Sequence, residues 1–120
     1  MDLLGVAPEP TDPARLRIEA ARTCDRLRTM SLVRLAASRL DGRSRAWEAV
    51  ELAQLCADEA AGLAGWPHRR LPEVADPMAG DVLATCAQDL VEQLEARPVE
   101  SAAEVCATVV ARMVALRRTL

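Results

Sequence analysis

Four cysteines are the residues of this chain best placed to do chemistry together. Each falls on the apolar face of a different long helix expected below. Four thiolates could hold zinc or a cluster if the sulfurs shared one layer, with zinc about 2.3 Å from each sulfur. However, free cysteine also behaves as a small buried hydrophobe, and none forms a CxxC pair. We therefore expect reduced, core-packed thiols and no metal site at Cys24, Cys56, Cys86 and Cys106.

Two pairs of carboxylates are the second candidate. Glu48 and Glu51 lie one helical turn apart, as do Asp89 and Glu92. Two such pairs on facing helices could hold Mg²⁺ for a nucleotide phosphate. Together with the segment GDVLATCAQDL, residues 80–90, this pattern is distantly similar to the all-helical nucleotide pyrophosphohydrolases of the MazG type. The resemblance implies a magnesium-dependent hydrolase, although the second pair reads Asp-x-x-Glu rather than Glu-x-x-Asp.

A DNA-binding segment is the third candidate. Residues 32–50 have the form of a helix, a glycine turn and a second helix that opens with Arg43 and Arg45. A recognition helix places such side chains in the major groove. Glu48 and Glu51 would then face phosphates, which repel them. With a net charge of −3 and a pI near 5.2, binding to nucleic acid or to an anionic membrane is not favoured.

Charge is unevenly distributed along the chain. Residues 15–45 hold nine arginines against three acids, whereas residues 73–104 hold eight acids against Arg97 alone. We expect complementary helix faces inside one bundle or across a symmetric dimer, and the alternative is a basic patch for an anionic partner. Lysine is absent and alanine is abundant, which is typical of a GC-rich bacterial genome and says little about function.

The stretch GWPHRRLPEVADP, residues 65–77, holds three prolines and the only histidine of the chain. The prolines prevent a helix from continuing, so this segment must connect two helices at the surface. It exposes Arg69 and Arg70 to a partner. His68 has no metal ligand at a suitable spacing, so we expect neither a metal nor a catalytic role for it.

Cap residues and apolar periodicity predict a chain of helices without strands. At 120 residues it should form one all-α domain, four-helix-bundle-like, with an additional short helix and the proline-rich connection. Residues 1–11 should be an extended leader and residues 12–120 the domain. The first helix should run from an Asp12 cap to about Met30, the second from Ser31 to the stop at Gly42, and the third from Ser44 to Gly65.

Two further helices are expected after the proline-rich connection. Asp76 and Pro77 should cap and open the fourth, and a capping box from Ser101 to Glu104 should start the fifth. Several residues define the expected faces. Leu32, Leu35, Ala36 and Leu40 should be buried in the short helix and Val82, Cys86, Leu90 and Leu94 in the fourth, whereas Gln54 should face solvent in the third.

Two apolar side chains are expected to lie outside the core and indicate an interface. Trp47 and Ile18 both lie away from the buried stripes of their helices, and aromatic residues are enriched at interfaces.

No nucleophile with its base and no glycine-rich phosphate loop is evident, so we assign no catalytic residue and no cofactor. No apolar run approaches the roughly 18 residues of a membrane span, and no secretion signal is evident, so we expect a cytoplasmic protein. The candidate interface residues are Trp47, Ile18, Trp66, Arg69 and Arg70.

The sequence therefore favours a non-enzymatic protein-interaction or accessory module that forms a homodimer or binds another protein. Its specific role and its partner stay open. Two alternatives also stay open, namely a DNA-binding regulator that uses residues 32–50 and a MazG-like pyrophosphohydrolase.

Overall fold

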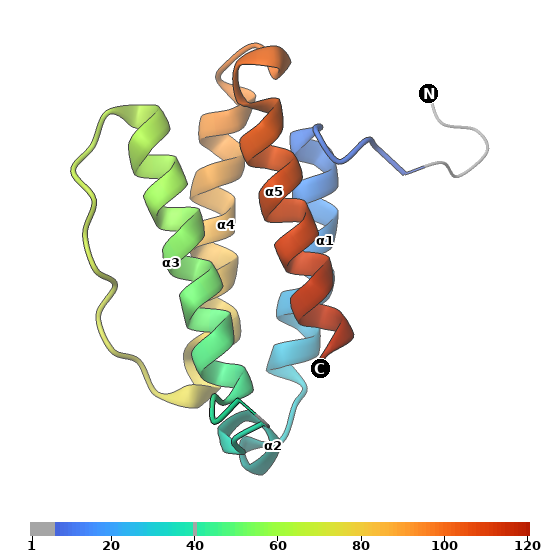
Figure 1. The fold of residues 1–120 in the computed structure, drawn as a ribbon, viewed down its shortest axis with the longest axis vertical. Helices are drawn as coiled ribbons and strands as arrows, with labels where there is room; N and C mark the ends of the chain where they lie inside the picture. Colours follow the sequence, from blue (N-terminus) through green and yellow to red (C-terminus); the bar gives the residue numbers. More distant parts are fainter. Residues whose placement is uncertain (1–6, 40) are drawn as a thin grey trace.

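The computed structural model describes residues 7–39 and 41–120, and over them the chain is all-α (Figure 1). The predicted four-helix-bundle-like fold, with a short additional helix and a proline-rich connection, is confirmed. Of the predicted leader, residues 1–6 lie outside the described part, and residues 7–12 contain no helix. The elements are α1 (Pro13–Arg28), α2 (Leu32–Ala36), α3 (Arg45–Ala64), the 3₁₀-helix η1 (Asp76–Met78), α4 (Ala79–Glu95) and α5 (Val99–Arg118).

The four long helices are packed side by side, but not equally tightly. In Figure 1, α1 and α5 descend while α3 and α4 ascend, so α3 and α4 are parallel and their connection must run back along the bundle. α4 packs closely on both α3 and α1, and α1 packs on α5, whereas α3 and α5 approach each other at few positions. One edge of the bundle is therefore incompletely closed.

Leucines, alanines, cysteines and methionine build the core where these helices meet. Leu16, Leu83, Leu90 and Met113 are completely buried. α1 and α4 approach so closely that a β-carbon at Gly80 would lie 3.2 Å from the carbonyl oxygen of Cys24 and 3.3 Å from Leu27 Cβ. Small residues at this contact allow the close approach. Within the described residues, no helix is both long and apolar enough to cross a membrane.

Opposite charges on α1 and α4 meet inside the chain. Arg17 pairs with Glu95 at 2.9 Å and Arg28 pairs with Asp81 at 2.7 Å. At these two pairs the basic first half meets the acidic fourth helix within one bundle, which is one of the arrangements that the sequence left open. Each of these pairs is substantially exposed, so each contributes orientation rather than much stability.

The predicted length of the short second helix is wrong. α2 ends at Ala36, and the chain then forms a tight turn in which Ser38 pairs with Ser44. The Gly42 N–H donates to the Arg39 carbonyl at 2.8 Å, and Gly42 has a φ of 81°. Glycine adopts this left-handed backbone without strain, so the turn replaces the last predicted turn of helix.

Two of the predicted buried faces are also corrected. In α2 only Leu35 is buried, whereas Leu32 is 60% exposed and Ala36 is exposed; Leu40 lies outside the described residues. In α4 Val82 is only half-buried, because the helix turns Leu83 and Val91 towards the core instead. Short helices and helix starts give too few turns to fix a face from periodicity.

The last two helices begin differently from the predictions. Asp76 lies inside the 3₁₀-helix and makes no capping hydrogen bond, so α4 starts later without a side-chain cap. α5 starts at Val99, before the predicted capping box, and its backbone kinks at Ala102 (φ −136°, ψ 16°). The Ser101 hydroxyl donates to the Pro98 carbonyl at 2.8 Å, which removes it from the capping role.

Candidate functional site

The connection between α3 and α4, residues 65–75, is held along α3, and we call it the strap. Gln54 of α3 forms the central attachment. Its amide nitrogen donates to the Arg69 carbonyl at 2.9 Å, and its amide oxygen accepts from the Leu71 N–H at 2.8 Å. Arg70 adds an ion pair to Glu51 at 2.7 Å. The strap covers Gln54, which is buried rather than solvent-facing as the sequence predicted.

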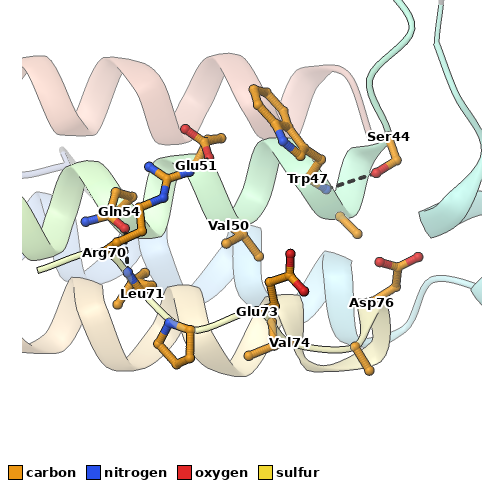
Figure 2. A pocket seen from close by; sticks show the side chains of 13 residues that line it. Ser44, Trp47, Val50, Glu51, Gln54, Arg70, Leu71, Glu73, Val74 and Asp76 are labelled. Atoms are coloured by element: carbon orange, nitrogen blue, oxygen red, sulfur yellow. Dashed lines mark hydrogen bonds and ion pairs between the residues drawn. The ribbon is translucent and has the colours of Figure 1, made fainter.

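Surface hollows lie under the strap on both sides of this attachment. One, of about 480 Å³, lies between α3 and residues 70–76 and is bordered by Val50, Glu73 and Asp76 (Figure 2). The other, of about 420 Å³, is lined by Trp66, Arg69 and Asp89. The strap is thus attached near its middle, with open space between it and the helices on either side.

Two more hollows lie one after the other between α3 and α5. One is about 280 Å³, with Trp47, Leu52 and Arg112 in its lining. The other is about 240 Å³ and is bordered by Leu55 and Val105. We call the surface formed by residues 47–59 of α3 and residues 104–116 of α5 the α3–α5 edge. Along this edge the two long helices leave a groove between them.

Trp47 is the largest side chain on this edge. It is 43% exposed, and the Arg43 guanidinium stacks over its ring at 4.6 Å from the ring centroid. Its ring lies towards α5, and Glu51 and the Arg70 guanidinium lie on the same side of α3 (Figure 2). The cation–π contact fixes one face of the indole and leaves the rest available.

The nine arginines of residues 15–45 all have contacts inside the described chain. Most pair with carboxylates or with Trp47, and others donate to carbonyl groups at the end of α5, where a helix dipole favours positive charge. Their partners are Glu19 for Arg15 and Arg22, Glu95 for Arg17, Asp81 for Arg28, Glu48 for Arg39, Trp47 for Arg43, the Leu120 carbonyl for Arg26 and Arg34, and the Arg34 carbonyl for Arg45.

The two predicted carboxylate pairs are not brought together. Glu48 pairs with Arg39 and lines the α3–α5 edge, and Glu51 pairs with Arg70. Asp89 instead borders the hollow beneath the strap, and Glu92 accepts a hydrogen bond from Gln88 at 3.2 Å. Over the part of the chain that the structure describes, no three His, Cys, Asp or Glu side chains cluster as metal ligands would.

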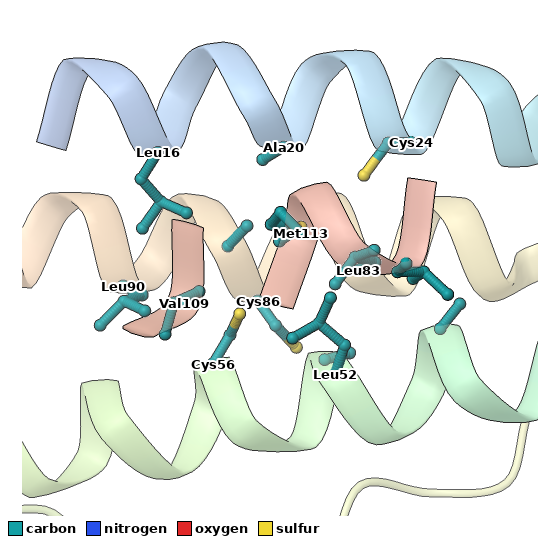
Figure 3. Close-up of a cluster of buried hydrophobic side chains, with 14 of the residues drawn as sticks. Leu16, Ala20, Cys24, Leu52, Cys56, Leu83, Cys86, Leu90, Val109 and Met113 are labelled. Atoms are coloured by element: carbon teal, nitrogen blue, oxygen red, sulfur yellow. The ribbon is translucent and has the colours of Figure 1, made fainter. Parts of the chain in front are cut away.

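All four cysteines are free and buried, as expected from the sequence. Figure 3 shows Cys24, Cys56 and Cys86 among the buried apolar side chains. Burial, together with the neighbouring Cys86 and Cys24 thiols, raises the pKa of Cys56 to about 12. Burial likewise raises the pKa of Cys24 and of Cys106 to about 11, and it raises the pKa of Cys86. These thiols are therefore protonated and unreactive at neutral pH.

This protonation predicts the labelling behaviour of the native protein. Iodoacetamide at neutral pH should modify none of the four thiols on the timescale in which it modifies all four in denaturant, because the thiolate is the reacting form. Intact-mass measurement counts the added groups. Modification of any cysteine in the folded protein as fast as in the denatured protein would contradict the buried, protonated state.

The comparisons with known proteins give no further information. The chain matches no family model, no curated protein and no solved structure. Function has to be inferred from the geometry alone.

The predicted interface residues lie on different parts of the molecule. Trp47 lies on the α3–α5 edge and also lines the first strap hollow together with Arg70, which is tied to Glu51. Trp66 and Arg69 border the other strap hollow. Ile18 is half-buried on α1, which is not one of the two helices of the edge. These five side chains therefore do not form one continuous surface.

Sequence reasoning missed a buried polar cluster between α1 and α5. Glu19 is only 2% exposed and accepts from Arg15 at 2.9 Å and from Arg117 at 2.7 Å. Thr23 donates to the Glu19 carbonyl at 2.8 Å. The available signal was Glu19 beside Leu16 on the apolar face of its helix, four residues after an arginine. The cluster therefore holds α5 against α1 rather than against α3.

Proposed function

We propose that this chain is a non-enzymatic protein-interaction module that associates with itself through the α3–α5 edge, with Trp47 as the main anchor. The observation that carries the proposal is a 43% exposed tryptophan, stacked against Arg43, beside the groove between α3 and α5. Tryptophan and arginine are the side chains most enriched among residues that dominate binding energy.

The apolar character of the edge supports this proposal. Half-buried Leu55 and Val105 border the groove, directly above the buried core residues Leu52 and Val109. Covering them removes further apolar surface from water, which is the main favourable term in protein association. The polar rim and the apolar floor match the usual composition of interfaces.

The contacts of the charged groups favour this function over the two alternatives. A DNA-binding role for residues 32–50 needs arginines aimed at phosphates, yet Arg43 stacks on Trp47 and Arg45 donates to the Arg34 carbonyl at 3.2 Å. A pyrophosphohydrolase needs Glu48 and Glu51 to face a metal, yet each pairs with an arginine. Both alternatives would require these contacts to break first.

Comparing the two tryptophans tests the function. Sedimentation equilibrium of the wild-type chain should give a mass that rises with concentration towards twice the 13.0 kDa of one chain. Trp47→Ala should weaken this association by about tenfold or more, as expected for an exposed aromatic anchor. Trp66→Ala is the matched control, because Trp66 is also exposed but lies on the strap, and its association should equal that of wild type.

Either of two results would contradict the proposal. A wild-type mass of one chain at every concentration would exclude self-association. Equal weakening by both tryptophan substitutions would show that Trp47 is not the anchor. Circular dichroism of each variant checks that the helical fold is retained.

A further inference from the structure

The two ends of the α3–α5 edge carry opposite charges. Glu59 and Glu104 border the groove at one end, and Arg112 borders it at the other. Glu104 and Arg112 are exposed. Within the described residues, none of the three takes part in an ion pair, unlike Glu48 and Glu51 on the same edge. Their charges are therefore available to a partner that covers the groove.

The spacing of these charges on α5 has a simple symmetry. Glu104 and Arg112 are separated by eight residues, or about 12 Å along a helix. Thr108 lies halfway between them and is exposed in the same groove. A twofold axis perpendicular to α5 near Thr108 would place each end of the edge against the opposite end of the same edge in a second copy. Glu104 of one copy would then meet Arg112 of its partner, twice in each dimer.

We infer that the α3–α5 edge docks a second copy of this chain in an antiparallel arrangement, with Glu59 and Glu104 of each copy against Arg112 of the other. The inference rests on the proposed function and adds the orientation and the paired charges. A parallel arrangement would instead oppose Glu104 to Glu104 and Arg112 to Arg112, which repel. A twofold interface is self-complementary by construction, so one sequence supplies both halves.

The charges and the apolar groups have separate roles in this dimer. Leu55 and Val105 lie near the proposed axis, where they would be covered most completely. Exposed ion pairs add little affinity, but opposing like charges disfavours wrong orientations strongly. The apolar centre and Trp47 therefore supply the affinity, and Glu104 and Arg112 fix the direction.

Charge reversal on α5 tests this arrangement. The dissociation constants of wild type, Arg112→Glu, Glu104→Arg and the double variant in one chain are measured by sedimentation equilibrium at low salt. Each single reversal should raise the dissociation constant about tenfold, because it opposes like charges at two symmetric places. The double variant should recover most of the lost affinity, because its reversed charges attract again across the axis, while the unchanged Glu59 then faces a carboxylate.

Arg118→Glu is the matched control, because it makes the same charge change at an exposed position of α5 outside the edge. It should leave the dissociation constant unchanged. A dimeric wild type with unaffected single variants would overturn the antiparallel arrangement while leaving self-association intact, and a double variant as weak as the single ones would do the same. A monomeric wild type would overturn the proposed function together with this inference. Thermal melts of all variants separate these outcomes from unfolding.

Discussion

Glu19→Ala is expected to lower the free energy of unfolding by about 3 kcal/mol. The substitution removes the carboxylate that neutralises Arg15 and Arg117 and leaves their guanidinium groups without an acidic partner between α1 and α5. Breaking a buried ion pair from one side is strongly destabilising, and the value lies at the low end because both arginines are about a quarter exposed. Urea unfolding at neutral pH measures the change.

Glu95→Gln provides the control for this loss. Glu95 also pairs with an arginine across two helices, but half of its side chain is exposed. Its removal should cost less than about 1 kcal/mol, as is usual for surface pairs. An equally small effect at Glu19 would contradict the buried cluster.

The pH dependence of stability should report the same carboxylate. Burial alone raises the pKa of Glu19, but the hydrogen bonds and charges of Arg15 and Arg117 outweigh it and hold the pKa below the ordinary value of 4.5. Because its pKa is lowered in the folded state, the Glu19 carboxylate stabilises the folded protein above pH 4.5. This stabilisation is lost as the pH falls through the pKa that Glu19 has in the folded state. Wild type should therefore lose its advantage over Glu19→Gln in acid.

Gln54→Ala is expected to increase the rate of tryptic cleavage after Arg69 and Arg70 by roughly ten- to a hundredfold. The variant loses both hydrogen bonds that hold the strap at Arg69 and Leu71. Each such bond contributes about 0.5–1.5 kcal/mol net, so losing two raises the open fraction of the strap by that factor. Mass spectrometry of the early fragments locates the cleavage sites.

Gln88→Ala is the appropriate control for the strap. Gln88 is an exposed glutamine on α4 that accepts from Arg17 and lines the hollow between α1 and α4. Its cleavage rate should match that of wild type. If Gln54→Ala were cleaved no faster than this control, the attachment of the strap at Gln54 would be wrong.

Helix starts with strong cap chemistry could be predicted from the sequence. The side chains of Asp12, Ser31 and Ser44 accept from backbone N–H groups as expected, and Gly65 ends α3 in the left-handed conformation. α1 and α3 also end close to the predicted residues. These signals are local, so the tertiary structure does not alter them.

Predictions failed where a second segment decides the outcome. Gln54 has the spacing of a solvent-facing residue, but it is covered by a strap more than ten residues away. Glu19 is buried because Arg117 reaches it from the other end of the chain. A buried charge requires such a partner, and periodicity within one helix cannot supply it.

The candidate surface was only partly visible in the sequence. The helical wheel placed Trp47 away from the buried stripe of α3, and the ring is indeed exposed. It could not show that α3 and α5 diverge, since that depends on which helices become neighbours. From the sequence alone, Glu104 and Arg112 are therefore indistinguishable from ordinary solvated charges. The structure places both beside the groove between α3 and α5.

Disulfide cross-linking at Thr108 would test most directly whether the α3–α5 edge is the contact between two copies. Thr108→Cys should form an intermolecular disulfide readily, because the proposed axis brings the two positions within the roughly 7 Å between Cα atoms that a disulfide requires. Thr85→Cys, an exposed position on α4, is the control. Rapid dimer formation at position 108 alone is the predicted result. Cross-linking at Thr108→Cys no faster than at Thr85→Cys would contradict self-association through this edge.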